Sequence, residues 1–435
     1  MVARHTGALL LSRIPVAVVV SLKEWALSLI THSSTGGSGI SVCMGLSVAS
    51  LGSETSGSII NPCSRNGIVG FKPTTALVPR DGVIPLSDRQ DSVGPMARTV
   101  RDAAHVLTAI ADPSVVDGSM RTTKVPDYLK FTEATDLTGL RIGVPREDIA
   151  RAVLLIREKN GNTGEEKDHL DHVLAIFSQA LRKLAALGAT VVDNVKFRSQ
   201  GEWNLIDPWP PATVSLEAEF KASLARWCSM LINNPQGIRT VDDLIDFTCR
   251  TNAAQEEYPK RDVGRLLNAQ KSPGVNAPVT QESLRRMLRC SGDEGILGAL
   301  KDYKVDTLVF PHLANLAATA MAAGVGLPIF ALPLGHYPKG TPTYMNGVAD
   351  ELREIDEGIP YVYLLNCSHR SAADIILYSF GIDFTAGPYT EPTLIRISSA
   401  FQKNWHVTHK AKMHVQPRTQ LKDVLEEKDK KRTKL

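Results

Sequence analysis

Two serines in glycine-rich surroundings are the residues of this chain best suited to chemistry. Ser34 lies in Ser33-Ser-Thr-Gly-Gly-Ser-Gly39, and Ser58 lies 24 positions later (58 − 34) in Leu51-Gly-Ser-Glu-Thr-Ser-Gly-Ser-Ile59. Glycine lets a backbone approach a ligand closely, and the run from Thr55 to Ser58 offers successive N–H groups in a flexible turn. Such donors suit an oxyanion hole, where they meet the charge that develops on an attacked carbonyl. The pattern therefore predicts serine-based attack on a carbonyl group.

The same stretch has a plainer interpretation as a flexible or phosphate-binding loop. It contains neither a GxGxxG nor a GxxxxGK[ST] pattern, so nucleotide binding is the weaker alternative. The cysteines include no CxxC pair and fit reduced thiols in an intracellular protein better than a disulfide framework or a zinc site. They are Cys43, Cys63, Cys228, Cys249, Cys290 and Cys367. We expect neither a metal nor another cofactor.

The elements around the two serines must hold both loops on one side of a core. Between the loops, residues 40–51 are expected to form a helix of small side chains packed tightly in the interior. Upstream, residues 16–20 are expected to form a buried β-strand and residues 21–30 a helix. Residues 75–100 are expected to be loop and turn.

The rest of the chain alternates between helical and strand-like patterns. Helices are expected at 101–111, 168–187, 295–301 and 316–323, and strands at 140–144, 189–195, 306–310 and 328–334. A helix followed by glycine and a strand is typical of a parallel α/β sheet, whose crossovers return the chain along one face. Residues 200–290 are expected to be mostly helical.

The composition is that of an ordinary globular protein. The chain has 435 residues, of which 43% are hydrophobic and 22% charged, enough for one large domain or two medium ones. Much of the formal net charge of +3 arises at the C-terminus, so the charge does not imply a nucleic-acid-binding surface on the rest of the chain. No run is long and apolar enough to span a bilayer. Residues 1–23 lack acidic side chains, a faint likeness to a transit peptide, but the expected location is the cytoplasm. The composition leaves the oligomeric state open.

Taken together, the motifs over residues 33–111 resemble the signature of the amidase family of serine hydrolases. They continue through Gly67-Ile-Val-Gly-Phe-Lys-Pro-Thr74 and Asp91-Ser-Val-Gly-Pro-Met-Ala-Arg-Thr-Val100, and the Gly-Ser-Glu-Thr of the second loop is similar to fungal members. The resemblance implies a mixed central β-sheet with helices on both faces, formed by a single domain over residues 1–402. A charged, disordered tail is expected at 403–435. The implied reaction is hydrolysis of a small-molecule carboxamide to a carboxylate plus an amine or ammonia.

The resemblance also implies roles for individual residues. Members of the family use a Ser–Ser–Lys triad, and matching the motifs makes Ser58 the nucleophile and Ser34 the bridging serine. The bridging serine relays a proton and later delivers it to the departing amine. Backbone amides of Thr55, Ser56, Gly57 and Ser58 would form the oxyanion hole.

The lysine of the triad has no clear counterpart in this chain. In the family it lies well upstream of the bridging serine, whereas the only lysine before Ser34 is Lys23, in a segment where no catalytic lysine is expected. Lys72 matches the family's Lys-Pro-Thr and is expected to be structural. A serine hydroxyl needs a neighbour that removes its proton. The general base is therefore expected to be missing, and activity to be weak or absent. In smaller departures, Ser33 stands where the family has glycine, and Ile60 replaces an arginine of bacterial members.

Residues 361–379 separate two phrases that the family joins directly, Gly358-Ile-Pro360 and Phe380-Gly-Ile382. We expect this insert and the short N-terminus, which resembles a truncation, to reflect a gene model with a retained intron and missing exons. The alternative is a genuine extra helix or strand.

Two other functions stay open beside the amidase hypothesis. One is a catalytically inactive, amidase-like binding or scaffold protein, and the other is the catalytic subunit of a tRNA-linked amidotransferase, which shares the signature. Among residues that could line a cleft, Asp91 and Arg98 are expected to be structural. His312 follows a predicted strand and is expected either to line a pocket or to be a satisfied loop histidine.

Overall fold

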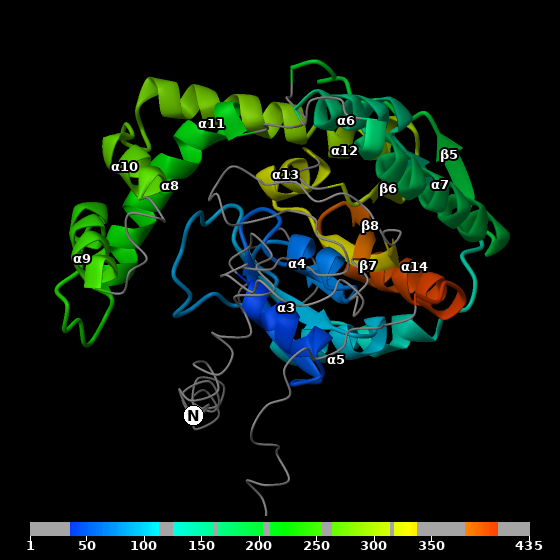
Figure 1. Cartoon of the computed structure of the whole chain (residues 1–435), viewed down its shortest axis with the longest axis horizontal. Helices are drawn as coiled ribbons and strands as arrows, with labels where there is room; N and C mark the ends of the chain where they lie inside the picture. Colours follow the sequence, from blue (N-terminus) through cyan, green and yellow to red (C-terminus); the bar gives the residue numbers. More distant parts are fainter. Residues whose placement is uncertain are drawn as a thin grey trace, which may run out of the picture.

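The computed structural model describes most of the chain around a central sheet (Figure 1). The described residues are 35–112, 125–159, 164–202, 209–254, 263–313, 317–336 and 379–407. The strand expected at 16–20, the helix at 21–30, the insert up to residue 378 and the tail beyond residue 407 lie outside these ranges. Within them, no helix is both long and apolar enough to cross a lipid bilayer.

A single mixed sheet organises the fold. Its strands are β1 (Ala49–Glu54), β2 (Val69–Lys72), β3 (Ser92–Ala97), β4 (Arg141–Val144), β5 (Thr190–Asp193), β6 (Thr307–Pro311), β7 (Ile329–His336) and β8 (Ser379–Ala386). They lie in the order β1-β3-β2-β7-β8-β6-β4-β5. Strand β4 runs parallel to β5 and β6, whereas the other neighbours are antiparallel. The mixed sheet implied by the family resemblance is confirmed.

The helix-then-strand order predicted a parallel sheet, and it was right only in part. Helices α6 (Arg146–Lys159) and α7 (Gly164–Ala186) join the parallel strands β4 and β5. Helix α13 (Ala317–Gly324) likewise returns the chain from β6 to β7 in the same direction, but β8 lies between them and is antiparallel to both. The late strand β8 therefore converts a parallel crossover into a mixed sheet.

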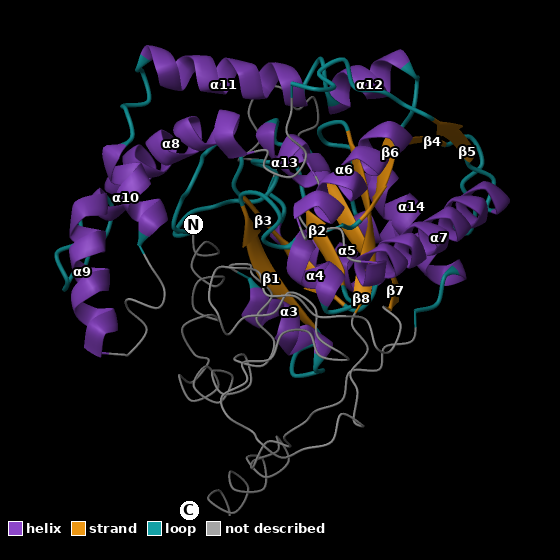
Figure 2. Ribbon diagram, turned by 45° about the horizontal axis from the view of Figure 1, so that its top comes forward, coloured by secondary structure: helices purple, strands orange, loops and turns teal. Residues whose placement is uncertain are grey.

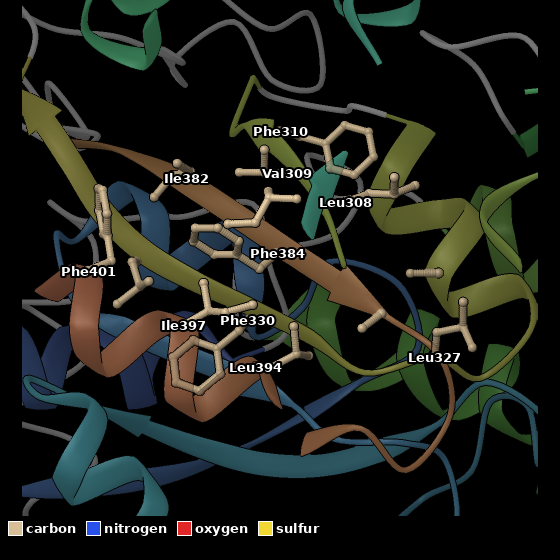
Figure 3. Close-up of a cluster of buried hydrophobic side chains, with 14 of the residues drawn as sticks. Leu308, Val309, Phe310, Leu327, Phe330, Ile382, Phe384, Leu394, Ile397 and Phe401 are labelled. Carbon is tan, nitrogen blue, oxygen red and sulfur yellow. The ribbon is translucent and has the colours of Figure 1, made fainter. Parts of the chain in front are cut away.

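Helices cover both faces of the sheet. On one face lie α3 (Gly36–Cys43) and α4 (Ile60–Arg65), and on the other lie α5 (Val100–Ile110), α7 and α14 (Glu391–Asn404). Successive side chains of β7 point to opposite faces of the sheet. Ala331 belongs to the smaller hydrophobic core on the α4 face, together with Cys63, and Phe330 belongs to the larger core on the other face. Figure 3 shows Phe330 with Leu394 and Ile397 of α14 in this larger core.

A group of helices extends away from the sheet as an arm (Figures 1 and 2). It consists of α8 (Trp209–Ser229), α9 (Val241–Ala254), α10 (Gly264–Lys271) and α11 (Pro278–Ser291). Leu224, Val241 and Val263 belong to a small core of its own. The mostly helical character expected for residues 200–290 is confirmed for the described part of this range. The remaining helices are α12 (Ile296–Asp302) and the short 3₁₀ helix η1 (Tyr128–Glu133).

The helix expected over residues 40–51 was wrong in extent. Helix α3 begins at Gly36 and ends at Cys43, and Gly45, with φ of 73°, turns the chain out of the helix. The following small residues form β1, which pairs with β3. At position 52 of this strand only glycine fits without a shift, because a Cβ there would lie 2.8 Å from Ile59 Cγ1. Strand β3 also corrects the expectation that 75–100 is only loop and turn.

The first turn of α6 contains a buried carboxylate that makes stability depend on pH. Burial, reinforced by the neighbouring Glu147, raises the pKa of Asp148 from 3.8 to about 6, and its Oδ2 has no hydrogen-bond partner among the described residues. Below about pH 3 the side chain is mostly neutral whether the protein is folded or unfolded. As the pH rises to about 6 the unfolded chain ionises first, so stability is lost across this window.

We therefore expect Asp148→Asn to stabilise the protein by about 2 kcal/mol at pH 7 and by little at pH 4. Urea unfolding at pH 4, 5, 6 and 7 measures the gap between variant and wild type. Glu133→Gln is the matched control, because its ion pair with Arg101 joins exposed side chains, so it should change stability by less than about 0.5 kcal/mol at every pH. A gap for Asp148→Asn that is the same at every pH would contradict this account.

Candidate active site

Ser58 lies in a turn between a strand and a helix. Strand β1 ends at Glu54 and helix α4 begins at Ile60, so the turn spans residues 55–59. Ser58 is partly exposed, between the buried residues Gly57 and Ile59. A strand–turn–helix is an arrangement that presents a serine hydroxyl outward from a sheet.

The carboxylate of Glu54 holds the far side of this turn. Its Oε2 accepts the backbone N–H of Ile59 at 2.7 Å and of Ile60 at 3.0 Å. Glu54 is 1% exposed, and burial raises its pKa, while Lys72 and these N–H groups oppose the rise. In the sequence Glu54 stood out only as part of a motif, and nothing local indicated this anchoring role.

Gly57 is required by the shape of the turn. Its φ is 85°, in the left-handed region, and a Cβ at this position would lie 2.7 Å from Nδ2 of Asn61. Asn61 is itself held by its backbone N–H, which donates to the Gly57 carbonyl at 2.8 Å. A side chain at position 57 thus meets both an unfavourable backbone conformation and a fixed neighbour.

We expect Gly57→Ala to destabilise the protein by about 2 to 4 kcal/mol, from left-handed strain plus overlap with Asn61. Displacement of the turn should also slow covalent labelling of Ser58 on the order of 100-fold. Gly82→Ala is the matched control, since Gly82 has φ of 82° but nothing within 4 Å of its Cβ position. It should cost only about 1 to 2 kcal/mol and leave labelling unchanged. Urea unfolding and labelling rates that fail to separate the two variants would count against the described turn.

The loop that contains the predicted bridging serine reaches the Ser58 turn. Thr35, which follows Ser34 in the chain, donates its hydroxyl to the backbone carbonyl of Ser58. Gly52 also packs against the Thr35 side chain, with a Cβ position 3.2 Å from its Cγ2. Ser34 itself, Ser33 and Lys23 lie outside the described residues.

Lys72 lies in a buried acidic environment on the α4 face of the sheet. Its Nζ donates to the carbonyls of Leu327 at 3.1 Å and Pro73 at 3.5 Å. Burial lowers its pKa to about 8, although the nearby carboxylates of Glu54 and Glu391 favour the charged form. Bonds to two backbone carbonyls and a fully buried position support the structural role expected for this lysine.

Two other residues considered as cleft candidates have local partners. Asp91 accepts the hydroxyl of Thr55 at 2.6 Å, which ties it to the Ser58 turn. His312 is buried beyond the end of β6, where its Nδ1 lies 2.7 Å from Oδ2 of Asp383 in β8. Arg98, by contrast, is exposed. The described ranges contain no group of three or more His, Cys, Asp or Glu side chains placed to hold a metal ion.

Comparisons with known proteins find similarity to amidases. A family profile described as Amidase matches residues 24–195. The chain is 33% identical over 396 residues to a protein of Arthroderma benhamiae named "Putative amidase", a match that covers 90% of this chain and 59% of that protein. It is 36% identical over 238 residues to a glutamyl-tRNA(Gln) amidotransferase subunit of Microcystis aeruginosa, over 54% of this chain and 43% of that protein. The chain therefore spans only part of the length of either relative.

A solved structure shares the fold. The native peptide amidase from Stenotrophomonas maltophilia aligns with a TM-score of 0.64 at 28% identity, over 87% of this chain and 66% of that one. The sequence motifs, the mixed sheet with its Ser58 turn and these similarities lead to one assignment. The chain belongs to the amidase signature family.

Proposed function

We propose that this chain acts as an amidase that hydrolyses a small-molecule carboxamide to a carboxylate plus an amine or ammonia. The contact between Thr35 and the Ser58 carbonyl carries the proposal, because it brings the loop of the predicted bridging serine to the predicted nucleophile. The partial exposure of Ser58 allows a substrate carbonyl to approach it.

In the proposed mechanism Ser58 Oγ attacks the amide carbonyl and forms an acyl-enzyme as the amine leaves. Ser34 relays the hydroxyl proton to the departing nitrogen, and water then releases the carboxylate. Backbone N–H groups of Thr55, Ser56, Gly57 and Ser58 stabilise the oxyanion.

The general base is the member of the triad to which no residue is assigned. We propose that Lys72 is not the base, because its ammonium group is engaged by backbone carbonyls. A serine without a base reacts through the small fraction of its hydroxyl that is ionised. Its reactivity should then be low and rise about tenfold per pH unit.

Labelling with a fluorophosphonate between pH 6 and pH 10 tests the function and the base together. Mass spectrometry should find the label on Ser58. A log-linear rise with pH supports a site without a base, whereas a plateau supports a titrating lysine beside the serines. Absence of label on Ser58 across the range, with the folded state verified, would overturn the hydrolase proposal.

The alternative is a protein that binds amides without turnover. It is motivated by the engagement of Lys72 with backbone carbonyls, which leaves the base unassigned. Thermal stabilisation by carboxamides without product formation would favour it. A role in a tRNA-linked amidotransferase is motivated by similarity to the Microcystis aeruginosa protein. Stable copurification with a partner protein is the observation that would favour this last alternative.

A further inference from the structure

A continuous path of hydrogen bonds connects the Ser58 turn to the helical arm. Thr55, the first residue of the turn, donates its hydroxyl to Asp91 Oδ1 at 2.6 Å. The other carboxylate oxygen of Asp91 accepts the backbone N–H of Leu86 at 2.6 Å and of Ser87 at 2.9 Å. The hydroxyl of Ser87 donates to Oε2 of Glu219, on α8 of the arm, at 2.5 Å.

The path is fixed at its arm end and shielded at its centre. Ser87 is fully buried and Asp91 is 7% exposed. The Glu219 carboxylate is also held by the guanidinium of Arg89, at 3.1 Å. Arg89 in turn donates to the carbonyl of Gly324, at the end of α13, at 2.8 Å. Hydrogen bonds in such shielded surroundings exchange little with water, so each can fix the orientation of the next group.

We infer that Glu219, acting through Ser87 and Asp91, is a positioning residue that sets the orientation of Thr55 and so the geometry of the oxyanion loop. The inference rests on the proposed amidase function of the same turn. Thr55 contributes both a backbone N–H to the proposed oxyanion hole and the side chain that Asp91 holds. The position of the arm thereby affects the orientation of the residues that would stabilise the transition state.

The arm and the 86–91 loop are also joined by a second contact, which provides a matched control. Arg226 of α8 pairs with Asp88 at 2.5 Å, but these side chains are 54% and 58% exposed. Within the described ranges the Asp88 side chain hydrogen-bonds to Arg226 and not to the residues of the path. If docking of the arm were all that mattered, breaking either contact would have similar effects. We expect instead that only the Ser87 path affects the turn.

The test compares Ser87→Ala and Glu219→Gln with Asp88→Asn in saturation kinetics of fluorophosphonate labelling at Ser58. We expect Ser87→Ala to lower the maximal labelling rate about fivefold, the typical effect of one hydrogen bond, with little change in the probe concentration at half-saturation. Glu219→Gln should act in the same direction more weakly, because its amide oxygen still accepts a hydrogen bond. Asp88→Asn should leave the rate within about twofold of wild type, because an exposed ion pair contributes little.

A double-mutant cycle separates positioning from a general loss of structure. Thr55→Val removes the first hydroxyl of the path, so Ser87→Ala should have little further effect in that background, and Thr55→Ser should restore most of the rate. Additive effects of Thr55→Val and Ser87→Ala, or equal effects of Ser87→Ala and Asp88→Asn, would overturn the inference.

Hydrogen exchange keeps the test independent of the proposed function. If no variant labels, including wild type, the hydrolase proposal fails and the exchange of backbone amides at residues 55–61 decides the inference. We expect faster exchange there in Ser87→Ala, with strands β6 and β8 unaffected, and no such change in Asp88→Asn. Unchanged exchange at residues 55–61 in Ser87→Ala would then refute the path.

Discussion

Ser58→Ala is expected to abolish fluorophosphonate labelling and to reduce any carboxamide hydrolysis to the uncatalysed background. The reason is chemical, because the acyl-enzyme needs the Ser58 oxygen and the turn supplies no second hydroxyl at the same place. Loss of a nucleophile in serine hydrolases typically costs on the order of 10⁶ in kcat when the rest of the site is intact. Here the measurable loss is set by the wild-type rate.

Ser56→Ala provides the comparison within the same turn. Ser56 contributes only its backbone N–H to the proposed oxyanion hole, and alanine retains that donor. We therefore expect this variant to label at a rate within a few-fold of wild type. If both variants lose labelling equally, or if Ser58→Ala still labels within the turn, Ser58 is not the nucleophile.

Lys72→Met is expected to lower the unfolding free energy by about 3 to 5 kcal/mol, the usual cost of removing one partner from a buried charge group. Glu54 and Glu391 are each 1% exposed, and Lys72 favours the charged form of both. Without Lys72 these carboxylates must be buried without its compensation or take up protons. Because Glu54 holds the amides of Ile59 and Ile60, the same change should also slow labelling of Ser58.

The double variant Lys72→Met with Glu54→Gln tests the cause of this loss. Replacing Glu54 by glutamine removes one of the uncompensated charges and keeps an oxygen that accepts the Ile59 and Ile60 amides. We expect urea unfolding to show that the double variant recovers at least about 1 kcal/mol relative to Lys72→Met alone. If the two substitutions destabilise additively, the loss in Lys72→Met is one of packing and not of charge.

Local patterns in the sequence predicted most of the elements and the family, because they depend on neighbouring residues. The helical periodicity at 168–187 corresponds to α7, and the apolar runs at 140–144 and 306–310 correspond to β4 and β6. The serine and glycine spacing identified the family, and the turn that carries Ser58 follows from the short segment around Gly57.

The same reasoning failed where pairing between distant segments decides the structure. Residues 49–51 were expected at the end of a tightly packed helix, yet they form part of β1 because β3 offers a hydrogen-bonding edge. The sheet is mixed because β8, which comes late in the chain, lies between β6 and β7. No local pattern shows which strand will fill that place, since the choice depends on contacts across long separations.

By itself, the sequence determined the family, the position of Ser58 and the set of residues available for an oxyanion hole. Only the tertiary structure decided which charges surround that turn. Thr74 binds Glu391 across 317 positions of the chain, and Ser87 binds Glu219 across 132. Folding alone brings such pairs together, because a buried carboxylate needs donors that its neighbours in the sequence do not supply.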